Sequence, residues 1–196
     1  MLTEKFSEAV ALAVKAHDGQ YRKVAKTIPY ISHPLAVASI CLEFGGNEDQ
    51  AIAALLHDVL EDGGLHYEAE ILEKFGENVH DIVKNCTDGT PDDNGKKLDW
   101  YARKTNYLNL LESVNEAAIL VITADKLHNV RSILQDLDTI GESVFDRFKT
   151  KKEGTLWYYR SVADVLHRRL KSPITRILCD LVLEMEEFKV TDVTHQ

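Results

Sequence analysis

The sequence contains little cysteine and no long apolar run. Its three cysteines, Cys41, Cys86 and Cys179, are odd in number and far apart, which fits buried thiols in a reducing cytosol better than a disulfide framework. The longest fully apolar runs, 51–56 and 117–122, fall well short of the roughly 20 residues that a membrane-spanning helix needs. The first ten residues carry charges where a signal peptide needs its apolar stretch. We therefore predict a soluble, cytoplasmic protein.

Positive charge is also scarce. The chain has 23 Lys and Arg residues against 32 Asp and Glu residues, which gives a formal net charge of −9. Nucleic acids and anionic membranes attract basic surfaces, so we expect neither as a partner. A phosphorylated substrate would need a local source of positive charge, such as a bound metal ion.

The pattern of apolar residues in the sequence is mainly helical. Apolar residues recur at helical spacing almost everywhere, and no segment alternates convincingly as a strand does. Hydrophobic residues make up 44% of the chain, which is enough for a core, and no repeat or linker divides it. The predicted helices cover 4–17, 32–44, 48–60, 67–75, 77–86, 99–111, 116–137, 155–170 and 173–188, with a short turn at 143–148 and a polar loop at 87–98. We predict an all-α fold, a single domain over residues 1–196 built as a bundle of about eight to ten helices.

Four polar side chains follow the apolar run 51–56. They are His57, Asp58, Glu61 and Asp62, and helical spacing places them on one side of the last turns. The three carboxylates repel one another, and their charge is unfavourable at a helix C-terminus. A divalent cation would resolve that conflict, and imidazole with carboxylate suits Mn, Fe, Co or Zn. The alternative is a core histidine beside solvated carboxylates at a helix end.

Two further residues favour the metal. His33 stands just before Pro34 at a helix start, and Asp125 interrupts the apolar stretch 117–127. A carboxylate inside a buried helix is costly unless it is paired or bound to a metal. An ion pair between Asp125 and a nearby Arg or Lys is the alternative. Asn129 lies four residues after Asp125 and therefore on the same helix face.

The order His33, then His57-Asp58, then Asp125 is the pattern of the HD-domain metal-dependent phosphohydrolases. Five segments narrow this likeness, because they resemble the hydrolase domain of the RelA/SpoT family over roughly residues 4–170. They are 17–23 (HDGQYRK), 29–34 (PYISHP), 57–62 (HDVLED), 124–131 (ADKLHNVR) and 155–163 (TLWYYRSVA). The resemblance implies a small alarmone hydrolase that removes the 3′-pyrophosphate of (p)ppGpp, gives GDP or GTP, and turns down the stringent response.

The resemblance also implies roles for individual residues. The residues that match the metal ligands are His33, His57, Asp58 and Asp125, and the family's usual ion is Mn(II). Glu61 and Asp62 match a catalytic pair beside the metal-bound water, where a carboxylate can orient water or accept its proton. The residues that match substrate-binding positions are Arg22, Lys23, Asn129 and Tyr159. Of these, the basic pair is expected to pack against the guanine base and to contact phosphate.

Two departures from the family pattern concern substrate range: Gly63-Gly64, where many members carry Glu-Asp-Thr, and a longer acidic loop at 88–99. Two alternative functions stay open. One is an HD phosphohydrolase for another nucleotide, such as a nucleoside monophosphate or the 2′-phosphate of NADPH. The other is a non-catalytic nucleotide-binding module, which would be expected to lack a metal ligand or the pair Glu61-Asp62. His128 is expected to pack against the site or to support a ligand rather than to bind metal.

Overall fold

The computed structural model describes residues 1–22, 27–87 and 98–188, and within them it is almost entirely helical. The α-helices are α1 (Glu4–Ala16), α2 (Ser32–Glu43), α3 (Glu48–Leu56), α4 (Glu68–Phe75), α5 (Glu77–Cys86), α6 (Trp100–Leu111), α7 (Glu116–Ile140), α8 (Lys151–Arg169) and α9 (Pro173–Glu187). A π-helix, η1 (Val59–Gly63), and two 3-10 helices, η2 (Leu65–Tyr67) and η3 (Gly141–Arg147), complete the set. The prediction of an all-α fold with eight to ten helices is confirmed.

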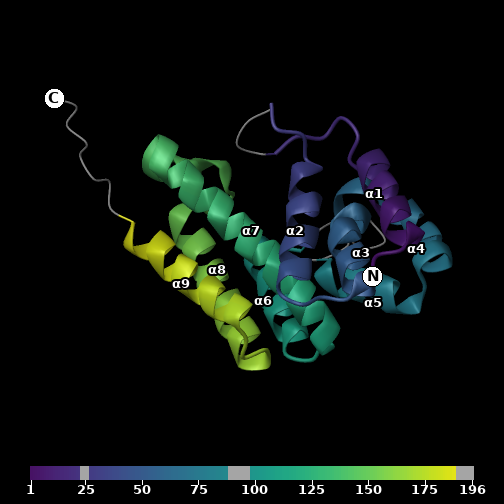
Figure 1. Cartoon of the computed structure of the whole chain (residues 1–196). Helices are drawn as coiled ribbons and strands as arrows, with labels where there is room; N and C mark the ends of the chain where they lie inside the picture. The colour runs from purple at the N-terminus through teal and green to yellow at the C-terminus, as the bar shows by residue number, and fades with distance from the viewer. Residues whose placement is uncertain (23–26, 88–97, 189–196) are drawn as a thin grey trace.

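The longest helix, α7, is the centre of the arrangement. Figure 1 shows α8 and α9 along one side of it and α1 to α5 gathered on the other. Helix α7 contacts α2, α3, α5, α8 and α9, and α2 also contacts α3. Because α2, α3 and α7 contact one another in pairs, one residue from each can meet at a single point.

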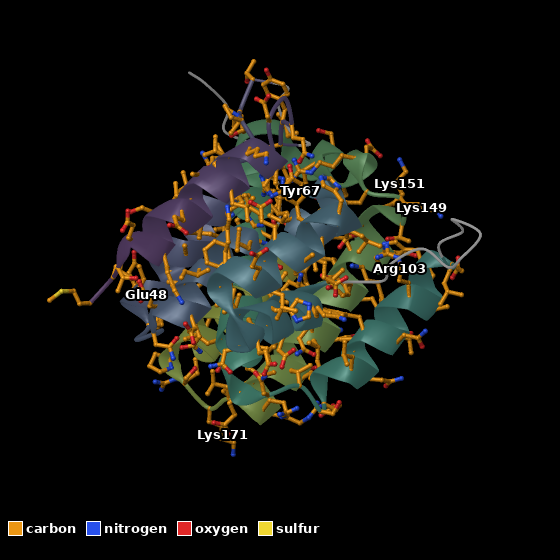
Figure 2. The ribbon with its side chains drawn as sticks, turned by 90° about the vertical axis from the view of Figure 1, so that its right-hand side faces the viewer. Glu48, Tyr67, Arg103, Lys149, Lys151 and Lys171 are labelled. Atoms are coloured by element: carbon orange, nitrogen blue, oxygen red, sulfur yellow. The ribbon has the colours of Figure 1, made fainter. Side chains whose placement is uncertain are left out.

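Residues 51–56 of α3 lie in the core. The six residues of the run 51–56 are each at most 1% exposed, so every face of this short helix is covered by protein. Burial of apolar surface contributes roughly 25 cal/mol per Å², which makes such a helix a strong anchor for its neighbours. Charged side chains such as Glu48, Lys151 and Lys171 lie at the outline of the molecule (Figure 2). None of the helices in the described residues is long and apolar enough to span a membrane.

Three α-helix boundaries differ from the prediction by three residues or more, and one of them is the end of α7, which lies at Ile140 and not at 137. Helix α3 ends at Leu56, not at 60. The next turn, η1, is a π-helix, in which the Gly64 N–H donates to the Val59 carbonyl at 2.9 Å, five residues earlier in the chain. Gly64 ends this turn at a φ of 120°, which side-chain-bearing residues rarely adopt. Helix α8 begins four residues before the predicted start at 155, and it includes Gly154.

Gly154 explains the earlier start of α8. A Cβ at this position would come within 2.3 Å of Thr150 and 3.0 Å of the Tyr101 hydroxyl, so the glycine permits close packing inside the helix rather than ending it. The predicted loop at 87–98 lies, apart from Thr87 and Leu98, outside the described residues.

Candidate metal centre

Two imidazoles and two carboxylates from three helical elements meet at one point. His33 is the second residue of α2, His57 and Asp58 lie between α3 and η1, and Asp125 lies in the middle of α7. The two Nε2 atoms are 3.2 Å apart. Asp125 Oδ1 lies 3.1 Å from His33 Nε2 and 3.6 Å from His57 Nε2, and Asp58 Oδ2 lies 3.6 and 3.1 Å from the same two atoms. The structure thus brings together all four residues predicted as ligands.

These distances suit ligands of one metal ion. Adjacent ligand atoms around a first-row ion, at bond lengths of about 2.0–2.2 Å, lie about 3 Å apart. The ligand atoms of His33, His57 and Asp58 are all within 4.8 Å of one another. Both histidines are buried, and each turns its Nε2 toward this centre. The donor set, nitrogen with carboxylate oxygen, favours a first-row divalent ion.

The backbone fixes the orientation of His57. Its Nδ1 lies 2.8 Å from the Ala54 carbonyl oxygen, which can only accept a hydrogen bond, so Nδ1 carries the proton. In the neutral ring the Nε2 lone pair then points into the centre. His33 Nδ1 lies 2.7 Å from Nδ1 of His128, a residue of α7.

Each carboxylate is also held by a neighbour. The Tyr30 hydroxyl donates to Asp58 Oδ2 at 2.6 Å. Asp125 accepts from Asn129 Nδ2 at Oδ1 and from Lys126 Nζ at Oδ2, both at 2.6 Å. The ion pair that the sequence left open for Asp125 is therefore present, and it leaves Oδ1 facing the two histidines.

The centre attracts positive charge. Burial alone would raise the pKa of the Asp125 carboxyl, but Lys126 and the two histidines hold it well below its usual range. Burial likewise opposes a charge on His57, yet Asp58 and Asp125 raise the pKa of its imidazole well above the usual value. Two ionised carboxylates in a buried site need balancing positive charge, which Lys126 and His57 supply without metal, and the donor set also fits a divalent metal ion.

Glu61 and Asp62 lie in η1, which directly follows His57 and Asp58. The Asp62 N–H donates to the Asp58 carbonyl at 2.9 Å, and Gln20 Nε2 donates to the Asp62 carbonyl at 2.9 Å. The predicted continuous helix is therefore replaced by a wider turn whose backbone at Asp62 is bonded to Asp58 and to Gln20.

The predicted substrate-binding residues differ in how the structure places them relative to the four-residue cluster. Arg22 Nη2 donates to Asn129 Oδ1 at 3.1 Å, and its guanidinium carbon lies 5.7 Å from the centre of the Tyr30 ring. Tyr159 of α8 is buried at 8% exposure, and this burial raises the pKa of its hydroxyl to about 12. Lys23 lies outside the described residues. Arg22 and Asn129 thus adjoin the four-residue cluster through Tyr30 and Asp125.

Two partners of the ligands were not predicted as site residues. Tyr30 stands three residues before His33 in the turn that precedes α2, and its place in the segment 29–34 is the signal that could have indicated it. The Ala54 carbonyl carries no sequence signal at all, because every residue has a carbonyl.

Comparison with known proteins places this chain in the HD domain family. The sequence profile of the HD domain family matches residues 9–155. Guanosine-3′,5′-bis(diphosphate) 3′-pyrophosphohydrolase MESH1 of Xenopus tropicalis is 40% identical over 128 residues, which are 64% of this chain and 68% of that protein. The guanosine-3′,5′-bis(diphosphate) 3′-pyrophosphohydrolase of Aquifex aeolicus is 38% identical over 132 residues, which are 66% of this chain but only 18% of that protein. The chain therefore spans less than a fifth of the Aquifex relative.

Two solved structures share the fold. A metazoan orthologue of SpoT, described as hydrolysing ppGpp, matches with a TM-score of 0.76 at 24% identity and covers 95% of this chain and 98% of its own. A protein of Listeria monocytogenes EGD-e matches with a TM-score of 0.66 at 28% identity and covers 80% of this chain and 97% of its own. The resemblance seen in the sequence is confirmed, and the first of these structures supports the fold alone.

Proposed function

Because the chain belongs to the HD domain family, we propose that it is a metal-dependent hydrolase that removes the 3′-pyrophosphate of (p)ppGpp, giving GDP or GTP and pyrophosphate. The observation that carries the proposal is the cluster of two imidazoles and two carboxylates with Glu61-Asp62 on the adjoining turn. The identity of the substrate is inferred from the activity named for the relatives.

Each group has a part in this reaction. His33, His57, Asp58 and Asp125 would hold the ion, for which we propose Mn(II). A bound divalent ion supplies Lewis acidity toward a phosphoryl oxygen and toward water. The carboxylates of Glu61 and Asp62 orient the attacking water and accept its proton.

Arg22 provides the local positive charge that this acidic protein lacks overall. Its guanidinium offers a planar face to a guanine base and a fork of N–H donors to phosphate oxygens. Asn129 bonds Arg22 through its carbonyl oxygen and Asp125 through its amide nitrogen, so it joins the substrate side of the site to a metal ligand. We propose contacts to the nucleotide from Arg22, Lys23, Asn129 and Tyr159.

Three further statements belong to the proposal. Residues 1–196 act as one domain, since α8 and α9, which extend beyond the matched region 9–155, pack on α7 and on each other. The enzyme works in the cytoplasm, which suits three cysteines that are free thiols. Its substrate is a small guanine nucleotide, and neither nucleic acid nor a membrane is a partner.

A nucleotide panel tests the reaction. Metal-free protein is incubated with ppGpp, pppGpp, GMP and NADPH, with and without added Mn(II), and the products are separated by anion-exchange chromatography. We expect intact pyrophosphate with GDP or GTP, only when metal is present. Orthophosphate from GMP or NADPH with no consumption of ppGpp would overturn the substrate. Full turnover in chelator would overturn the metal.

Two histidine variants give this experiment a matched control. His57→Ala removes a ring whose Nε2 faces the cluster, whereas His80→Ala removes a ring whose Nε2 lies 3.0 Å from Glu68 Oε1, between α5 and α4. We expect His57→Ala to lose both metal and turnover, and His80→Ala to keep both. Equal activity of the two variants would contradict the assignment of the site.

A further inference from the structure

We propose that His128 is a positioning residue for the metal centre: its Nδ1 accepts a hydrogen bond from Nδ1–H of His33 and so holds the His33 ring with Nε2 toward the ion. The inference rests on the proposed metal site but not on the identity of the nucleotide. It assigns a task to a histidine that the catalytic scheme does not use.

The contact between the two rings is direct and short. The Nδ1 atoms are 2.7 Å apart, the ring centroids are 4.8 Å apart, and the ring planes make an angle of 41°. Two imidazole nitrogens at this distance form a hydrogen bond only if one carries a proton and the other presents a lone pair. The position of the proton on one ring therefore determines the position on the other.

Metal binding decides which ring donates. His33 Nε2 faces His57 Nε2 at 3.2 Å and Asp125 Oδ1 at 3.1 Å, so this nitrogen is the one that a metal would occupy. A ring that gives its Nε2 lone pair to a metal keeps its proton on Nδ1. His128 Nδ1 must then be the acceptor. The pair also stays bonded without metal, because either ring can donate.

In the part of the chain that the structure describes, His128 is the hydrogen-bond partner of His33 Nδ1. His33 is 1% exposed, so water has little access to its Nδ1 if the partner is removed. A buried N–H without an acceptor costs about 1–3 kcal/mol. His57 differs, since its Nδ1 bonds the backbone carbonyl of Ala54, which no substitution removes. The contact of His33 with His128 can therefore be tested by mutating the partner, whereas the contact of His57 with a backbone carbonyl cannot.

One helix, α7, carries both Asp125 and His128. His128 lies three residues after the ligand Asp125, so α7 supplies both a metal ligand and the partner of the α2 ligand. Residues 33 and 128 are 95 positions apart in the chain, and the contact forms only when α2 is docked on α7. Position 128 thus links the packing of two helices to the direction of one metal-binding nitrogen.

Three variants test the proposal. His128→Phe keeps a planar ring and removes the acceptor, whereas His128→Asn places an amide oxygen close to the position of the lost Nδ1. His80→Phe is the control, because it makes the same exchange at a histidine outside the cluster. The readout is the dissociation constant of Mn(II), measured by competition with a chelator on metal-free protein whose thermal unfolding is recorded alongside.

We expect His128→Phe to weaken Mn(II) binding about 10–100-fold, the usual effect of removing a group that orients a metal ligand. His128→Asn should stay within about threefold of the wild type, because the acceptor is restored. His80→Phe should bind like the wild type. If His128→Phe does not fold, His128→Leu makes the same test with a smaller side chain.

Two outcomes would overturn the proposal. Equal weakening by Phe and Asn would mean that the ring acts only by packing, and unchanged affinity in both would mean that His33 needs no partner. The measurement uses no nucleotide. A failure of the proposed substrate therefore leaves this result untouched, and a failure here leaves the nucleotide assay to be judged separately.

Discussion

The ion pair between Asp125 and Lys126 gives a quantitative prediction for the metal-free protein. Lys126 Nζ lies 2.6 Å from Asp125 Oδ2, and the two side chains are 13% and 10% exposed. Without metal the buried charges balance, because Asp58 and Asp125 are opposed by Lys126 and by His57, whose pKa is raised by the carboxylates despite burial. Asp125→Asn keeps the shape and leaves one cation unbalanced.

The size of the effect follows from this burial. Removal of one partner of a buried ion pair costs about 3–5 kcal/mol, because the other charge stays buried without compensation. The double variant Asp125→Asn/Lys126→Met removes both charges, so the remaining His57 and Asp58 balance each other. We expect it to regain most of the lost stability. Neither variant should bind metal with wild-type affinity, since both lack the proposed ligand Asp125.

Urea unfolding of chelator-treated protein, followed by far-ultraviolet circular dichroism, measures both effects. With a slope of about 2–3 kcal/mol per M, a loss of 3–5 kcal/mol lowers the midpoint by about 1.5 M. The coupling between the two sites comes from the full cycle, including Lys126→Met alone. A loss below about 1 kcal/mol for Asp125→Asn would show that the pair behaves as an exposed one and would refute the argument.

Three other predictions concern catalysis and support of the site. Glu61→Gln and Asp62→Asn should each lower kcat about 10²–10⁴-fold with Mn(II) content unchanged, and normal turnover in both would mean that these carboxylates only end a helical turn. Arg22→Ala should raise KM for ppGpp while Mn(II) content stays at the wild-type level; an unchanged KM would remove Arg22 from the substrate site. Tyr30→Phe should lower the free energy of unfolding of the metal-free protein by about 1.5–3 kcal/mol, the value of a hydrogen bond to a charged group, and an unchanged urea midpoint would contradict this.

Apolar periodicity predicts the helices and singles out Asp125, whereas the full set of four clustered residues comes from the resemblance to the HD-domain pattern. Apolar periodicity marks the buried faces, and polar residues within buried faces stand out against it, as Asp125 does within 117–127. The hydrophobic effect acts along the whole chain, so its pattern survives without knowledge of which helices pack together.

The contacts that hold these four residues could not be predicted in the same way. Tyr30 and Asp58 are 28 positions apart, and His33 and His128 are 95 apart, so their pairing depends on how the helices dock. The pair Asp125–Lys126 is adjacent in sequence, and adjacent helical residues do not usually face each other. The π-turn η1 depends on tertiary contacts such as the bond from Gln20 to Asp62.

The origin of the cluster from α2, the end of α3 and α7 has a consequence for folding kinetics. Its internal contacts join residues 24 and 92 positions apart, and contacts this distant close late because the loop entropy must be overcome first. An ion bound there stabilises the native state by about 2.7 kcal/mol at a concentration of 100 times Kd. Interactions that are absent from the folding transition state act on unfolding. Bound metal should therefore lengthen the lifetime of the native fold about 100-fold at this concentration, while refolding proceeds at nearly the metal-free rate.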